Sequence, residues 1–155
     1  MARRPLTDTP IDQKTKQEAH KKAQQTLKHY LKTRQFLAAF VVAFSILEDR
    51  LGALDVVYRR DIAADGSHPS PKPRGFAQMV TLLNEKGYIS DSLRKRLFKV
   101  NGLRIDVFHA SMYNITAVKR LQVERVIRVT RLIASRLERE KRLIKKSKLR
   151  DSESQ

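Results

Sequence analysis

Two side chains with reactive chemistry, Arg104 and His109, lie five positions apart in a stretch that otherwise has the apolar pattern of a buried helix. A histidine side chain exchanges a proton near neutral pH, and an arginine side chain binds a phosphate through two hydrogen bonds at once. Asp106 lies between them and supplies a carboxylate. These residue types allow three interpretations: the pair cuts RNA, it binds RNA without cutting it, or both side chains only pack against the fold.

The elements that must position this segment are all predicted to be helices. Apolar residues recur at intervals of three and four in residues 37–58, the period of a helix that buries one broad face. Residues 75–86 and 90–109 carry shorter stripes of the same kind. Gly87 lies between them, and Ser90 or Asp91 caps the start of the second. Residues 11–31 and 116–146 complete the set. The sequence therefore predicts an all-α bundle of about five helices.

The remaining stretches are predicted to lie outside the helices. Residues 59–73 contain several prolines and predict a surface loop, and residues 110–114 predict a turn. We expect a flexible arm over residues 1–10, one helical domain over residues 11–146 and a disordered tail over residues 147–155. The apolar stripes of the long helices predict a buried face that includes the leucine and valine positions Leu37, Val41, Leu121 and Leu132.

Positive charge is concentrated on the first and last predicted helices. The formal net charge is +17 at pH 7, and a field of this size attracts polyanions such as nucleic acids. A basic surface with no polyanionic partner is the alternative. Basic residues on the predicted helices are candidate nucleic-acid contacts: Arg94, Lys95, Lys99, Arg125, Arg128, Arg139, Lys145 and Lys146.

Several other classes of site are excluded or disfavoured by the composition. The chain has no cysteine, which excludes disulfides, thiolate metal sites and a cysteine nucleophile. Neither a metal-ligand spacing nor a glycine-rich phosphate loop is present, so we expect no metal and no cofactor. The N-terminus lacks the pattern of a secretory signal, and no apolar run approaches the roughly 20 residues that span a bilayer. We expect a cytoplasmic protein without a membrane partner.

The segment from Arg104 to His109 resembles the signature of the HEPN superfamily of all-α domains, in which an Arg is followed by a His after four to six residues. The resemblance covers roughly residues 25–140, including the long apolar helix that carries Glu48 and the long helix after His109. It implies metal-independent RNA cleavage at a site assembled across a homodimer. Residues five apart on a helix are separated by about 140° and about 7.5 Å of rise. Two chains related by a two-fold axis can nevertheless bring both copies of Arg104 and His109 into one groove.

The resemblance also implies a role for each residue. His109 would act as a general base on the ribose 2′-hydroxyl or as an acid toward the leaving oxygen. Arg104 would hold the scissile phosphate, and Asp106 or Glu48 would orient either residue. The implied enzyme is an endoribonuclease of the defence or toxin kind, which leaves a 2′,3′-cyclic phosphate. RNA rather than DNA is the expected partner, with a cognate antitoxin as a further one.

The alternative is a catalytically silent protein on the same fold, which binds nucleic acid as a regulator or assembles a ribonucleoprotein. Many HEPN proteins carry Asn or another polar residue directly after the Arg, whereas this chain has Ile105. That departure and the charge of both terminal helices favour the silent protein. His109 is then a core or helix-end histidine. Arg104 is then the partner of a nearby carboxylate: Asp106, Glu48 or Asp91.

Overall fold

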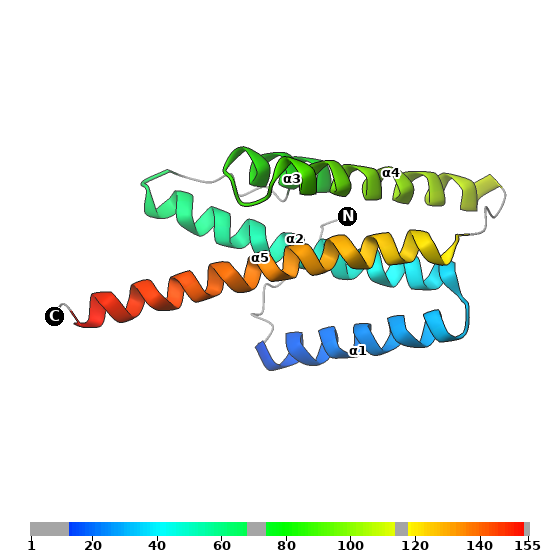
Figure 1. The fold of residues 1–155 in the computed structure, drawn as a ribbon, viewed down its shortest axis with the longest axis horizontal. Coiled ribbons are helices and arrows are strands. Elements are labelled where there is room, and N and C mark those ends of the chain that lie inside the picture. The colour runs from blue at the N-terminus through cyan, green and yellow to red at the C-terminus, as the bar shows by residue number, and fades with distance from the viewer. Residues whose placement is uncertain (1–12, 68–73, 114–117, 154–155) are drawn as a thin grey trace, which may run out of the picture.

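The computed structural model describes residues 13–67, 74–113 and 118–153, which form five helices and no strand. The prediction of an all-α bundle of about five helices is confirmed. In order they are α1 (Gln13–Lys32), α2 (Phe36–Ala64), α3 (Phe76–Glu85), α4 (Asp91–Tyr113) and α5 (Arg120–Glu153). Figure 1 shows α2 and α5 together in the middle, with α1 on one side of them and α3 and α4 on the other.

The core forms where α2 packs along α5. Leu47, Leu51 and Leu54 follow one another at three- and four-residue spacing on α2 and are fully buried. Val126 and Ile133 of α5 are fully buried as well. Burying large aliphatic side chains of this kind stabilises a fold by about 1.5–3 kcal/mol each. This pairing of α2 and α5 provides the rigid layer against which α4 is held.

The predicted junction between α3 and α4 is confirmed. Gly87 follows α3 with a φ of 76°, a left-handed conformation that costs glycine little because it lacks a Cβ atom. Ser90 then caps α4, since its Oγ accepts a hydrogen bond from the backbone N–H of Leu93 at 3.2 Å. Asp91 lies in the first turn of α4, where a negative charge interacts favourably with the helix dipole. These local signals determine the residue at which α4 begins.

Three helices continue further than the sequence predicted. α2 ends at Ala64 rather than near residue 58, because residues 59–64 contain no glycine or proline and Arg59 forms an i,i+4 ion pair with Asp55. The turn predicted at residues 110–114 is wrong for residues 110–113, which complete α4. α5 continues to Glu153, so residues 147–153 are helical where the sequence predicted a disordered tail. The expected arm at residues 1–10 lies outside the described residues.

Some apolar positions that were predicted to be buried are exposed. Leu37 and Val41 on α2, and Leu121 and Leu132 on α5, all lie on the surface. On α4, Ile105 is 49% exposed and Phe108 is 52% exposed, so the segment around Arg104 is not the fully buried helix that its composition indicated. The reason is geometric, since each of these helices has neighbours on only part of its circumference and the apolar residues extend past the packed face.

Candidate nucleic-acid interface

The guanidinium of Arg104 lies against α2, where it makes two contacts, and it makes a third with Phe108 of its own helix. Its Nη1 atom is 3.0 Å from Oε1 of Glu48. Its Cζ atom lies 4.8 Å from the centre of the Phe44 ring and 5.7 Å from the centre of the Phe108 ring. An ion pair and stacking on aromatic faces together fix the plane of a guanidinium. Of the partners that the sequence left open for Arg104, the structure places it with Glu48.

His109 and Asp106 lie on other parts of the α4 surface. Both are exposed, and neither forms an ion pair with any residue in the described part of the chain. α4 is one uninterrupted helix from Asp91 to Tyr113, so Arg104 and His109 are about 140° apart around its axis. One chain therefore brings Arg104 and Glu48 together but does not bring His109 to them.

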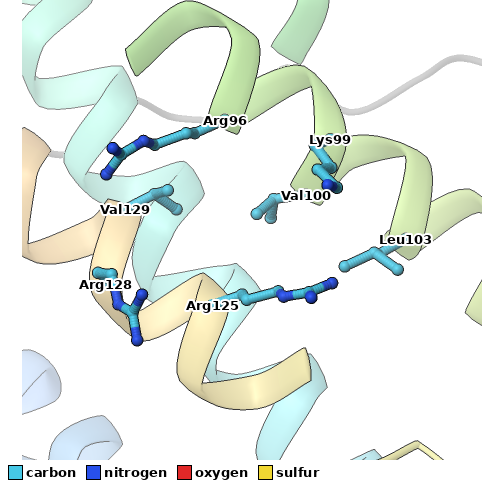
Figure 2. Close-up of a pocket in the computed structure, with 7 residues that line it drawn as sticks. All are labelled: Arg96, Lys99, Val100, Leu103, Arg125, Arg128 and Val129. Atoms are coloured by element: carbon cyan, nitrogen blue, oxygen red, sulfur yellow. The ribbon is translucent and has the colours of Figure 1, made fainter. Parts of the chain in front are cut away.

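A pocket of about 210 Å³ lies between α4 and α5 and gathers basic side chains (Figure 2). Its apolar part consists of Val100 and Leu103 from α4 and Val129 from α5. Its four remaining lining residues are all cationic, and no acidic residue lines it: Arg96 and Lys99 come from α4, and Arg125 and Arg128 come from α5.

Helical spacing explains how the pocket forms. Arg96, Lys99, Val100 and Leu103 follow one another at i, i+3, i+4 and i+7, so they share one face of α4. Val100 is buried, whereas Arg96 and Lys99, which precede it on the same face, are exposed at the edge of the pocket. α5 repeats the arrangement, with buried Val129 directly after an exposed arginine. In Figure 2 the side chain of Arg125 extends from α5 toward Leu103 of α4.

The four cations of the pocket are electrostatically unmatched. None of them forms an ion pair with a residue that the structure describes. Cations that surround a concave surface with apolar walls add their potentials, and this raises the local concentration of anions. The pocket is consequently a place where a bound phosphate would relieve repulsion between like charges.

The sequence predicted three of these four residues as nucleic-acid contacts: Lys99, Arg125 and Arg128. It missed Arg96, although the spacing of Arg96 to Lys99 and Val100 was a usable signal. The other predicted contacts lie outside the pocket. Arg94 is partly buried, and its Nε atom is enclosed without a hydrogen-bond partner among the described residues. The rest are exposed elsewhere on α4 and α5: Lys95, Arg139, Lys145 and Lys146.

A second group of arginines, at the C-terminal end of α2, is paired with a carboxylate. Asp55 accepts hydrogen bonds from Arg59 Nε at 2.8 Å and from Arg74 Nη1 at 2.6 Å. The side chains of Asp55 and Arg74 are each only 7% exposed, so this pair is held away from solvent. Arg74 also stacks on the ring of Tyr58, with its Cζ atom 5.0 Å from the ring centre. The cluster fixes residue 74 against α2.

A further polar contact joins the α3–α4 junction to α2. The hydroxyl of Tyr88 donates a short hydrogen bond to Asp61. Burial raises the pKa of Tyr88, and the bond to Asp61 raises it further. Burial acts against ionisation of Asp61, but hydrogen bonds from Tyr88 and Arg60 outweigh it and lower the pKa of Asp61. The Asp61 carboxylate is thus kept charged.

Two kinds of feature are absent from the part of the chain that the structure describes. No helix there is long and apolar enough to cross a membrane. No group of three or more histidine and carboxylate side chains there is placed to hold a metal ion. Comparisons of the chain with protein-family models, with curated proteins and with solved structures found no match.

Proposed function

We propose that the protein binds RNA and that the pocket between α4 and α5 holds the RNA backbone. The observation that carries the proposal is that four cations, and no acidic residue, line this one concave site. Its volume of about 210 Å³ lies below the range of about 300–1,000 Å³ that is usual for drug-sized organic ligands. A phosphate group is small enough to enter the pocket, and its negative charge complements the cations.

The lining residues favour contact with the backbone over readout of bases. Arginine and lysine bind phosphates through charge and donated hydrogen bonds, and such contacts carry no sequence information. The pocket has no aromatic residue on which a base could stack. Binding should therefore tolerate many sequences. The choice of RNA over DNA rests on the resemblance of the Arg104–His109 segment to HEPN domains, so a DNA of the same sequence belongs in the experiment.

The test compares two double variants that lose the same charge. Lys99→Gln with Arg125→Gln removes two cations from the pocket, one from each helix. Lys21→Gln with Lys28→Gln removes two exposed cations from α1, which lies across the α2–α5 layer from α4. We expect the pocket variant to bind RNA about tenfold more weakly, or about 1.4 kcal/mol, and the α1 variant to bind nearly as the parent does. Equal affinities for all three proteins would contradict the proposal.

A second candidate function is metal-independent RNA cleavage by Arg104 and His109. Its support is the fixed orientation of the Arg104 guanidinium, held by Glu48 and by Phe44, together with an exposed imidazole on the same helix. Because one helix separates the two side chains by about 140°, this candidate needs a homodimer that brings His109 of one copy toward Arg104 of the other. Asp106 or Glu48 would serve as the orienting carboxylate.

This candidate is tested by incubating RNA with the protein in EDTA. Cleavage should leave a 2′,3′-cyclic phosphate and should be lost in His109→Ala. His29→Ala, which changes an exposed histidine on α1, is the matched control. Intact RNA with the parent protein, or cleavage that survives His109→Ala, removes the enzyme from consideration and leaves RNA binding as the function.

A further inference from the structure

The last helix contains a repeat of eleven residues. Leucine begins each of three successive repeats, and arginine occupies the eighth position of each. The leucines are Leu121, Leu132 and Leu143, and the arginines are Arg128, Arg139 and Arg150. Eleven residues advance an α-helix by three turns and about 20°, so equivalent positions form a nearly straight line along its surface.

These positions, with two more cations, form a continuous exposed surface that we call the α5 ridge. Arg125 and Lys146 fall on the same line, and the eight side chains lie within an arc of about 60° around the helix. All of them are exposed: Leu121, Arg125, Arg128, Leu132, Arg139, Leu143, Lys146 and Arg150. No acidic residue falls within this arc. Three glutamates outside the arc pair with other residues of α5: Glu124 with Arg120, Glu138 with Lys141 and Glu140 with Arg136.

The cations of the α5 ridge begin at the pocket and continue past the bundle. Arg125 and Arg128 belong both to the ridge and to the pocket lining. From there to Arg150 the helix rises by about 38 Å at about 1.5 Å per residue. Figure 1 shows the C-terminal part of α5 extending beyond the ends of the other helices. A linear polyanion held in the pocket therefore meets further cations along α5 toward its C-terminal end.

We propose that a single strand of RNA runs along the α5 ridge, with its backbone on the cations and its unpaired bases against the leucines between them. The alternation of cation and leucine favours a single strand, because the bases of a duplex are stacked inside and would leave the leucines without an apolar contact. The ridge is also straight and narrow, whereas each strand of a duplex winds away from such a line.

This inference rests on the proposed RNA binding at the pocket and adds the form and direction of the ligand. The cationic part of the ridge, about 38 Å from Arg125 to Arg150, suits a strand of several nucleotides, within the range of about 4–16 nucleotides known for single-strand sites. Affinity should thus increase with oligonucleotide length across that range, because each added contact releases counterions. Beyond the length that covers the ridge, it should rise only slowly.

The experiment measures binding of an oligouridylate length series, and of a duplex of matched length, to the full chain. Arg139→Gln with Lys146→Gln removes two ridge cations outside the pocket. Lys141→Gln with Lys145→Gln removes the same charge from neighbouring turns but from another face of α5, and is the control. We expect the ridge variant to bind short strands as the parent does and to lose about tenfold on the longest strand. The control should follow the parent, and the duplex should bind more weakly than the single strand.

The possible failures can be told apart. If the ridge variant keeps the full dependence on length while the pocket variant loses affinity, the ridge is not used and RNA binding at the pocket stands. If the duplex binds as tightly as the single strand, the assignment of a single strand is wrong. If neither the pocket variant nor the ridge variant differs from the parent, the proposed function fails together with this inference.

Discussion

Two groups of arginines in this protein differ in one respect, which is whether carboxylates face them. At the far end of α2, Arg59 and Arg74 share Asp55, which is almost fully buried. In the pocket between α4 and α5, Arg96 and Arg125 line the wall together with Lys99, and no acidic residue lines it. The chain carries 33 basic and 16 acidic residues, so half of its cations at most can be matched one to one. The positions of the acidic residues therefore determine which cations stabilise the fold and which are available to a ligand.

Arg104 belongs with the matched group by this criterion. It pairs with Glu48 and stacks on Phe44, so part of its charge is already compensated within the chain. A phosphate can therefore bind Arg104 only if it displaces the Glu48 carboxylate or binds the guanidinium beside it. The unmatched pocket needs no such competition, and for this reason we place RNA binding there first and cleavage second.

The largest effect on stability is expected for Asp55→Asn. The substitution leaves Arg74 buried without its counter-charge, and breaking a buried ion pair in this way costs about 3 kcal/mol. Urea denaturation measures the loss. Asp49→Asn is the control, because Asp49 is 68% exposed and its contact with Arg50 is 3.5 Å long, so its effect should stay below about 0.5 kcal/mol. A loss below about 1 kcal/mol for Asp55→Asn would mean that the matched cluster does not hold the fold.

Tyr88→Phe should have an intermediate effect that depends on pH. Losing the hydrogen bond to Asp61 should lower the free energy of unfolding by about 1–1.5 kcal/mol near neutral pH. The bond lowers the pKa of Asp61 in the folded state, so its contribution is present above the unfolded value near 3.8 and is lost as pH falls through the folded value. Parent and variant should therefore converge in stability below about pH 4.

The control for this prediction is Tyr30→Phe, since the Tyr30 hydroxyl makes no hydrogen bond with a described residue. Chemical denaturation at several pH values is the measurement. A constant difference between Tyr88→Phe and the parent across the acid range would show that the bond does not favour the charged form of Asp61.

Arg104→Ala should destabilise the fold by about 1 kcal/mol. The variant loses an ion pair that is about one-third exposed and the stacking of the guanidinium on Phe44 and Phe108. Thermal or urea unfolding detects a change of this size. Arg104→Lys keeps the charge but not the planar contact, so it should recover only part of the loss. Full recovery with lysine would assign the effect to charge alone.

Arg96→Gln should have the smallest effect on stability. Whether the free energy of unfolding rises or falls shows whether Arg96 serves the fold. Arg96 forms no ion pair with the described residues, and its removal relieves repulsion from the neighbouring cations of the pocket. The free energy of unfolding should stay within about 0.5 kcal/mol of the parent or rise slightly. A clear loss of stability would show that this arginine serves the fold and would erase the distinction between the two groups.

Much of the helical frame could be predicted from the sequence because it depends on local signals. The three- and four-residue spacing along α2, the glycine after α3 and the serine before α4 each act within a few residues. Helix ends without such signals were misplaced, as at residues 110–113 and 147–153, where the chain contains neither glycine nor proline. Exposure of Leu121 and Leu132 depends on which helices lie opposite α5, and sequence spacing does not report that.

The candidate site was only partly predictable for the same reason. Lys99, Arg125 and Arg128 were identified as cations on helices, but their place around one pocket requires the packing of α4 on α5. The partner of Arg104 could not be chosen from sequence, because Glu48 lies on another helix while Asp106 is a near neighbour in the chain. Long-range pairing of this kind follows from tertiary packing alone.

The most direct test of the central claim is the salt dependence of RNA binding by Lys99→Gln with Arg125→Gln. Each phosphate contact contributes about 0.7 to the slope of log K against log salt concentration for a single strand. We expect a slope about 1.4 smaller than that of the parent, whereas Lys21→Gln with Lys28→Gln should leave the slope unchanged. An unchanged slope in the pocket variant, or an equal decrease in the α1 variant, would contradict the assignment of RNA binding to the unmatched cations between α4 and α5.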